Sequence, residues 1–402
     1  MRTTLKLFTI IVLLTVYSTC LRAQKKEISQ ARTYIKSGKD FDKAAKLMQE
    51  LIEKDSASRR NPKVYEIWFD AVKHQYDQGN EKLYLKEKYD TTALYGYTKS
   101  MFAILCSLDS VETLLMEEHS KKGVPKSRKK NAETLHRFRP NLFHAGTHYY
   151  RNADFAKAYS FFATYVESTS KPLFESYDWA KDRRVASAAF WATACGNKMQ
   201  DPELTLRFAP IAENDTTRLR LTLRYESEAY LRQKDDAHYV ETLRRGMRRF
   251  PKHEYFFTRI MDFYTDNHLP DSALNVTNEA LAMIPDCNLF LFAKSTVLLN
   301  LGRNDECISV TKQLIEQCDS LSEPYYNIGC ALLNKALLME ERHRRNREEI
   351  KALYSEARPY MERYRLLEPN QTKKWAPALY RIYLNLNMGE QFEEIDNILS
   401  NM

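Results

Sequence analysis

Two histidines stand at a spacing that could hold a metal ion. His144 and His148 are four residues apart, so on a helix they share one face. A zinc-peptidase motif would place Glu directly after the first histidine, but position 145 is Ala, and the chain offers no convincing third ligand. We therefore predict no metal site and interpret the pair as helix histidines beside a packing position at Gly146.

Two arginine-rich and lysine-rich stretches have the chemistry to bind an anionic partner. Residues 119–139 contain eight Lys and Arg side chains against one acid, Glu133. We expect a basic linker over 119–131, which is either a flexible segment or an anion site. The second cluster runs from Arg342 to Arg347 and is flanked by Glu residues, so a solvated helix face with i,i+4 ion pairs competes with anion binding.

Six Asp-Ser/Thr triplets are candidate modification sites. They resemble O-glycosylation sites of exported proteins in some Gram-negative anaerobes, and average composition predicts about one of them. Helix capping is the alternative, because Asp, Ser and Thr start helices by hydrogen bonding to free amides. The triplets begin at Asp55, Asp90, Asp109, Asp215, Asp271 and Asp319.

Recognised catalytic motifs are missing from the sequence. It contains no Gly-rich phosphate loop, no G-x-S-x-G segment and no spaced nucleophile–base pair. We therefore expect neither enzyme activity nor a cofactor. A metal-dependent enzyme that uses His144 and His148 is kept as an alternative.

The first 23 residues have the pattern of a secretory signal. Arg2 and Lys6 precede an apolar run over 7–17 that is too short to span a membrane, and Ala23 suits cleavage. A lipoprotein signal that uses Cys20 is the alternative. Removal of this segment lowers the formal charge from +8 to +5, because three basic residues and no acid are lost. We expect an exported protein, periplasmic or associated with the outer membrane of a Gram-negative bacterium, with no transmembrane segment and no nucleic-acid partner.

The elements that position these residues repeat with a period of 34 residues. Pro251 and Pro285 are one period apart, and so are Tyr230 and Tyr264. This period is typical of a helix–turn–helix unit that stacks on its neighbours. Only 10 Gly and 13 Pro in 402 residues argue against a turn-rich β protein.

One segment matches the unit best, through small residues that permit close helix approach and aromatic residues that fill the cleft. These are Leu142, Ala145, Gly146, Tyr149, Phe155, Ala158, Phe162 and Tyr165. On these residues the chain resembles the tetratricopeptide repeat (TPR) family. The resemblance implies an all-α, TPR-like α-solenoid, a right-handed superhelix of about eight to nine antiparallel helix hairpins. We expect the TPR solenoid over 139–402 and degenerate helical hairpins over 24–138.

The repeat register is interrupted over about 335–354. It returns about 16 residues late, at Ala357. No Gly or Pro lies between Met339 and Tyr354, so we predict lengthened helices there. A last hairpin begins near Trp375.

The resemblance also implies a concave groove, which the first helices of successive TPR hairpins line. The matching positions are Phe143, Thr147, Tyr150, Arg224, Glu228, Arg259, Asp262, Phe292, Thr296, Tyr326, Asn327, Tyr380 and Tyr383. This mix of aromatic, charged and amide side chains suits an extended peptide or a partner helix. For each residue singly, packing between neighbouring hairpins is the alternative.

Six cysteines remain after the signal, without the paired C-x-x-C spacing of a zinc site. By repeat position, Cys287 precedes the first helix of a hairpin and Cys318 ends the second, and antiparallel helices bring these ends together. We therefore name them as a candidate disulfide, which export permits but does not require.

Taken together, these features favour an exported TPR scaffold that binds a peptide or a partner helix of another protein. A glycan-binding helical accessory protein of an outer-membrane uptake system is the main alternative. The sequence does not identify the partner or the oligomeric state.

Overall fold

The computed structural model describes residues 24–342 and 347–402, and these ranges contain helices and turns without a β-strand. The predicted all-α fold is therefore confirmed. The described chain forms two compact units, which we call unit 1, ending at Lys234, and unit 2, Asp235–Met402. The signal-like segment lies outside the described residues.

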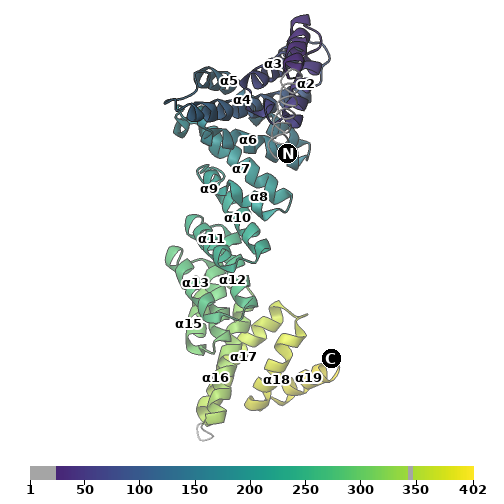
Figure 1. The fold of residues 1–402 in the computed structure, drawn as a ribbon. Helices are drawn as coiled ribbons and strands as arrows, with labels where there is room; N and C mark the ends of the chain where they lie inside the picture. The colour runs from purple at the N-terminus through teal and green to yellow at the C-terminus, as the bar shows by residue number, and fades with distance from the viewer. Residues whose placement is uncertain (1–23, 343–346) are drawn as a thin grey trace, which may run out of the picture. The chain divides into compact units, whose positions relative to one another are not determined.

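Unit 1 is a series of helices, most of which pack on the next one in the chain (Figure 1). A helical segment over 24–37 comes first. It is followed by α2 (Phe41–Lys54), α3 (Pro62–Tyr84), α4 (Thr91–Glu118), α5 (Arg128–Arg151), α6 (Phe155–Glu167), α7 (Arg183–Lys198), α8 (Pro202–Arg207), α9 (Ala209–Ala212) and α10 (Leu219–Gln233). Three short 3-10 turns between 168 and 181 connect α6 to α7, and α7 also packs on α9 and α10.

Unit 2 is built in the same way, and its helices also contact their chain neighbours. They are α11 (Asp236–Arg249), α12 (Glu254–Asp266), α13 (Pro270–Met283), α14 (Asn288–Asn300), α15 (Asn304–Gln317), α16 (Glu323–Arg342), α17 (Arg347–Leu367), α18 (Thr372–Leu386) and α19 (Gly389–Ser400). Antiparallel helix pairs that stack in sequence are the architecture of a TPR-like α-solenoid, as predicted.

Aspartates fix the starts of several helices, because a side-chain carboxylate can accept hydrogen bonds from the free amides of a first turn. Asp90 accepts from the Thr92 amide at 2.8 Å. Asp201 accepts from the Leu204 amide at 2.9 Å. The helix that α8 begins is broken before α9, where Pro210 lacks the amide that would continue it.

Close helix approach depends on glycine at Gly146 and Gly196. A Cβ atom at Gly146 would lie 2.7 Å from the ring of Phe162, which is fully buried. A Cβ at Gly196 would lie 2.4 Å from the backbone nitrogen of Thr205. These two positions hold α5 against α6 and α7 against α8, and the apolar core of unit 1 fills the remaining space.

The interrupted repeat corresponds to the long pair α16 and α17, of 20 and 21 residues, against 13 or 14 for α12 to α15. Tyr354 and Tyr364 are fully buried in the core that this pair shares with α18. Of the expected arginine cluster, Arg344, Arg345 and the side chain of Arg342 lie outside the described residues.

The expected basic linker over 119–131 needs correction. α5 already begins at Arg128, and the expected domain boundary at 138/139 falls inside this helix. Arg128 is only 8% exposed, because its Nε donates to Asp109 at 2.8 Å and its Nη1 donates to Glu175 at 2.8 Å. Acids far away in the sequence thus neutralise a cation that looked unpaired locally. Within the described residues, no helix has the length and apolar character of a membrane span.

Candidate functional site

A groove of about 650 Å³ lies in unit 1, where the helical segment 24–37, α3 and α5 surround two residues of α4. Each of the three surrounding elements is the first helix of a hairpin. We call this cavity the N-terminal groove. It is lined by Arg32, Ile35, Lys36, Glu66, Ile67, Phe69, Asp70, Lys73, Leu105, Leu108, Ser127, Lys130, Asn131 and Thr134.

Helical periodicity places these side chains in the groove. Arg32 and Lys36 are four residues apart, so they share one face of the first segment. Glu66 and Asp70 have the same spacing on α3, and Lys130 and Thr134 have it on α5. Each helix therefore presents one polar stripe to the cavity.

The floor of the groove is apolar. Leu105 and Leu108 of α4 and Ile67 of α3 are at most 6% exposed. Ile35 and Phe69 lie between this floor and the solvent, and both are only partly buried. An apolar surface of this kind, rimmed by charges, is typical of sites that bind other molecules.

The rim carries cations on its two outer helices and carboxylates on the middle one. Among the described residues, Arg32, Lys36, Lys130 and Glu66 form no ion pair. Lys73 differs, because its Nζ lies 2.5 Å from Asp77 Oδ2. The groove therefore has exposed positive charge at both sides that the described part of the chain does not neutralise.

One donor in the groove wall is unused. The Asn131 Nδ2 atom is inaccessible to solvent and has no hydrogen-bond partner among the described residues. An orphan buried donor costs about 1–3 kcal/mol. A bound acceptor would remove that cost only if the Asn131 amide turned toward the groove, because Nδ2 is inaccessible in its present position.

The predicted groove residues of α5 instead pack between helices. Phe143 meets the ring of Phe162 edge-on, with 5.5 Å between centroids. Tyr150 meets Trp191 of α7 at 4.8 Å. The Thr147 hydroxyl donates to the carbonyl of Phe143. Phe143 thus packs within its own hairpin and Tyr150 packs against the next one, whereas the Thr147 bond lies within α5 and does not test its groove position.

Arg224 and Glu228 lie at the surface of α10 and pair with each other, Nε to Oε1, at 2.8 Å. The second oxygen of Glu228 accepts from Asn197 of α7 at 3.1 Å. The Asn197 side-chain oxygen, Oδ1, accepts from Arg232 at 3.0 Å. This polar cluster ties α7 to α10, and its single carboxylate, Glu228, is already paired with Arg224.

The remaining predicted residues belong to unit 2, so the predicted set is divided between the two units. Arg259 and Asp262 are exposed, and 3.5 Å separates Arg259 Nη1 from Asp262 Oδ2. Asn327 is only 4% exposed and donates to Ser295 at 3.0 Å and to Thr296 at 3.1 Å. As a groove residue Asn327 is therefore wrong, because its amide serves to join α16 to α14. Phe292, also on α14, is partly buried.

The three predicted tyrosines of unit 2 are packing residues. Tyr383 is 3% exposed and donates to Glu362 at 3.1 Å, and burial raises its pKa to about 12. Tyr380 packs on Phe392 at 4.7 Å, and Tyr326 packs on Tyr364 at 5.0 Å. A degenerate repeat predicts on which face of a helix these residues lie, but not how far their side chains are buried.

The two histidines and the candidate disulfide are placed as follows. His144 is exposed, whereas the ring of His148 packs against Tyr95 with 5.6 Å between centroids. Cys287 and Cys318 are both free thiols, which corrects the predicted pairing. Adjacent helix ends alone do not provide the Cα spacing of about 5.5–6 Å and the side-chain geometry that a disulfide needs.

Capping accounts for some of the Asp-Ser/Thr triplets. Asp55 accepts from the amides of Ala57 and Ser58, and Asp90 accepts from that of Thr92. The hydroxyl-bearing residues of five triplets are nevertheless exposed, and they are Ser56, Thr91, Ser110, Thr216 and Ser320. Glycosylation of these sites stays a prediction.

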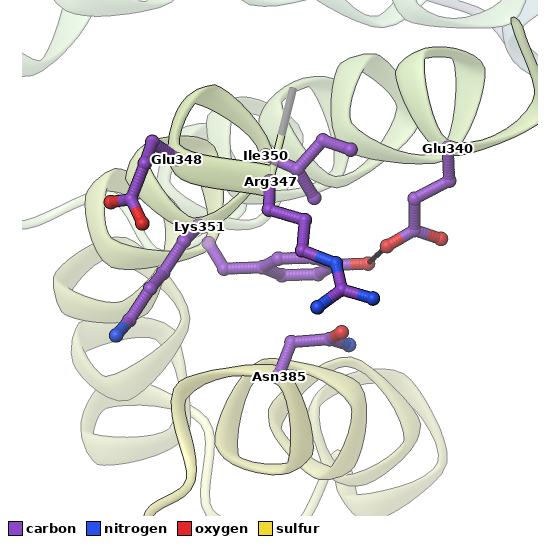
Figure 2. Close-up of a pocket in the computed structure, with 7 residues that line it drawn as sticks. Glu340, Arg347, Glu348, Ile350, Lys351 and Asn385 are labelled. Carbon is purple, nitrogen blue, oxygen red and sulfur yellow. Dashed lines mark hydrogen bonds between the residues drawn. The ribbon is translucent and has the colours of Figure 1, made fainter. Parts of the chain in front are cut away.

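A second pocket, of about 520 Å³, lies between the long pair α16 and α17 and the helix α18. Figure 2 shows Arg347 and Asn385 directed toward each other, while Glu348 and Lys351 point elsewhere. Glu340 accepts a hydrogen bond from Tyr354 at 2.9 Å. Two cations and two carboxylates line this pocket, so it has no preference for one sign of charge. The N-terminal groove is therefore the better candidate.

Comparison with known proteins gives structural likeness only. No family model matches the chain, and no curated protein matches it in sequence. Among solved structures, it is similar to the C-terminal part of a TPR repeat-containing protein from Cytophaga hutchinsonii, with 12% identity and a TM-score of 0.42 over 64% of this chain and 94% of that one. It is also similar to YrrB, a TPR protein with an unusual peptide-binding site, with 15% identity and a TM-score of 0.33 over 48% of this chain and 90% of that one. For human IFIT1 the identity is 14% and the TM-score 0.35, over 78% of this chain and 73% of that one. At these scores nothing about function is transferred.

Sequence reasoning missed the N-terminal groove because the repeat is least regular there. Without a register, no TPR position can be assigned to Phe69 or Asn131. One available signal was the pair of cations Arg32 and Lys36 at i,i+4 on a helix.

Proposed function

We propose that this chain is an exported interaction scaffold that binds a segment of a partner protein in the N-terminal groove. The observation that carries the proposal is an apolar floor with unneutralised cations on both sides and an unused buried donor in its wall. Stacked hairpins suit this role, because they expose long surfaces on a rigid frame.

Site-specific photo-crosslinking tests the binding role. A benzophenone amino acid replaces Phe69 in the groove, and in a control it replaces Tyr84, which is 86% exposed at the end of the same helix. Both variants are expressed in the source organism and irradiated. We expect discrete protein adducts from position 69 that position 84 does not give. Identical adduct patterns, or no adduct at position 69, would contradict the proposal.

Charge reversal at the rim of the groove provides a second test of the binding role. Lys36→Glu with Lys130→Glu changes the rim of the groove, whereas Lys39→Glu with Lys46→Glu makes the same change in net charge outside it. We expect the position-69 adducts to decline only in the rim variant. Adducts that decline equally in both variants would show a general charge effect.

Export is part of the proposal, and it rests on the pattern of the first 23 residues. Mass determination of the mature N-terminus in fractionated cells tests it. We expect a chain that starts at Gln24. An acylated Cys20 would show a lipoprotein instead, and an uncleaved Met1 in the cytoplasm would refute export.

A further inference from the structure

We infer that the partner segment is extended, with an apolar centre flanked by acidic residues on both sides. This inference rests on the proposed function and specifies the occupant of the N-terminal groove. Three properties of the groove lead to it, namely its volume, the arrangement of its charges and the orphan donor of Asn131.

The volume of the groove limits how much chain can enter. A residue in an extended chain fills about 160 Å³, taking about 3.3 Å along the strand, about 4.8 Å between strands and about 10 Å across the side chains. About 650 Å³ therefore holds about four residues. Four residues form barely one helical turn, which is not stable alone, but as an extended segment they reach about 13 Å.

The charges of the rim favour acidic residues at both ends of the partner segment. Arg32 and Lys36 lie on one side of the groove and Lys130 on the other. Carboxylates that flank the apolar centre of a partner would meet a cation on each side. A segment with basic flanks would face repulsion at the same places. The apolar floor excludes a purely polar polyanion as the preferred occupant, because its burial would desolvate charges without apolar contact.

The orphan amide of Asn131 favours an extended backbone over a helical one. Carbonyl groups in the interior of a helix are already hydrogen-bonded within the helix, whereas those of an extended segment are free to accept. One such carbonyl would satisfy the Nδ2 donor once the Asn131 amide turns toward the groove, since Nδ2 is inaccessible in its present position. Ser127 and Thr134 lie about one turn on either side of it, but their hydroxyls already donate to Glu112 and to the Lys130 carbonyl, so Asn131 carries the unused donor of this wall.

Binding of four synthetic peptides to the chain from residue 24 onward, measured by fluorescence anisotropy, tests the inference. The first peptide is end-blocked, with four Val and Leu residues between two Glu residues. The second has Lys in place of Glu, and the third has Gly and Ser in place of the apolar centre. The fourth is a 14-residue helical peptide with a Leu stripe and Glu at both ends, because about this length is needed for a stable helix.

We expect the first peptide to bind at least about tenfold more tightly than each of the others, in keeping with several weak charge pairs acting together with apolar contact. Lys36→Glu with Lys130→Glu should remove this preference and favour the second peptide. Lys39→Glu with Lys46→Glu should leave the ranking unchanged. Asn131→Leu should weaken the first peptide while keeping its advantage over the second.

The outcomes separate this inference from the proposed function. Equal binding of the first and second peptides overturns the inferred acidic flanks, and equal binding of the first and third overturns the apolar centre. Tighter binding of the fourth peptide shows a helical occupant and overturns the extended one. In each of these cases, specific adducts at position 69 would still support a protein-binding scaffold. If neither adducts nor peptide binding occur, both the inference and the proposed function are refuted.

Discussion

Arg139 of α5 holds the irregular connection between α6 and α7, and replacing it tests how unit 1 is fastened. The side chain is only 2% exposed. Its Nε donates to Ser168 Oγ at 2.9 Å, its Nη2 donates to the carbonyl of Tyr165 at 3.1 Å, and its Nη1 donates to Asp182. One guanidinium thus joins the end of α6 to the start of α7.

Aromatic rings complete the environment of this guanidinium. Its central carbon lies 3.7 Å from the ring centroid of Tyr165 and 4.3 Å from that of Trp179. Tyr177 stacks on Trp179 at 5.3 Å and on His136 at 4.8 Å. Because a guanidinium is planar and can donate along several directions at once, Lys cannot replace it here.

The expected cost of Arg139→Lys follows from these contacts. The ammonium group can keep the ion pair with Asp182 but loses about two hydrogen bonds, each contributing about 0.5–1.5 kcal/mol. Loss of planar stacking adds up to about 1 kcal/mol. The local free energy of opening should therefore fall by about 2–3 kcal/mol, which accelerates amide exchange by about 30- to 150-fold.

Hydrogen exchange measured by mass spectrometry on peptides that cover 168–182 is the assay. Arg137→Lys is the matched control, because Arg137 is exposed and makes only a 3.5 Å hydrogen bond to the Glu133 carbonyl. Peptides from unit 2 provide an internal reference. Exchange in Arg139→Lys within about threefold of the wild type would refute the reasoning, since about 0.65 kcal/mol corresponds to that ratio. Equal acceleration throughout unit 1 would show a global rather than a local role.

Two further predictions concern the same unit. Gly146→Ala should destabilise unit 1 by about 1–2 kcal/mol, because overpacking against Phe162 exceeds the gain in helix propensity. Gly96→Ala should stabilise it by about 0.5–1 kcal/mol, because no atom lies within 4 Å of the added Cβ. Thermal unfolding of both variants checks the opposite signs, and equal shifts would contradict the packing argument. Burial works to raise the pKa of Asp182, but hydrogen bonds from Arg139 and from a backbone amide outweigh it, so the pKa lies below the unfolded value of 3.8. The stabilisation from Asp182 is therefore complete above that value and lost as the pH falls through the folded pKa, so the 168–182 connection should loosen only below about pH 4. Amide exchange corrected for intrinsic rates measures this, and Asp182→Asn, which has no charge to lose, should remove the pH dependence.

The sequence predicted the packing of this chain better than its surfaces. Small and aromatic positions such as Ala145, Ala158 and Phe162 are fully buried, as their spacing indicated. These positions are recognisable because each hairpin needs the same close contact with its neighbour, so the same residue types return every period. The lengthened pair α16 and α17 was predictable for a different reason, since neither Gly nor Pro lies in the interruption.

The burial of individual side chains and their hydrogen-bond and ion-pair partners could not be predicted, because they depend on residues far apart in the sequence. Asn327 occupies a position that faces the groove in a regular repeat, yet it is buried against Ser295 and Thr296. Arg128 looked like part of a basic linker until the fold brought Asp109 and Glu175 to it. In both cases the partner lies about 19 to 47 positions away, beyond the reach of any local pattern.

The same reasoning explains why the candidate site lies where the repeat signal is weakest. A position that must pack against the next hairpin is held to a narrow choice of residues, whereas a position that meets a partner is free to depart from it. The N-terminal hairpins depart most, and they enclose a charged groove with an apolar floor. The cations Arg32, Lys36 and Lys130 contribute little to folding there, because no acid among the described residues pairs with them. These unpaired cations beside an apolar surface, together with the unused donor of Asn131, are the observations on which the proposed acidic partner segment rests.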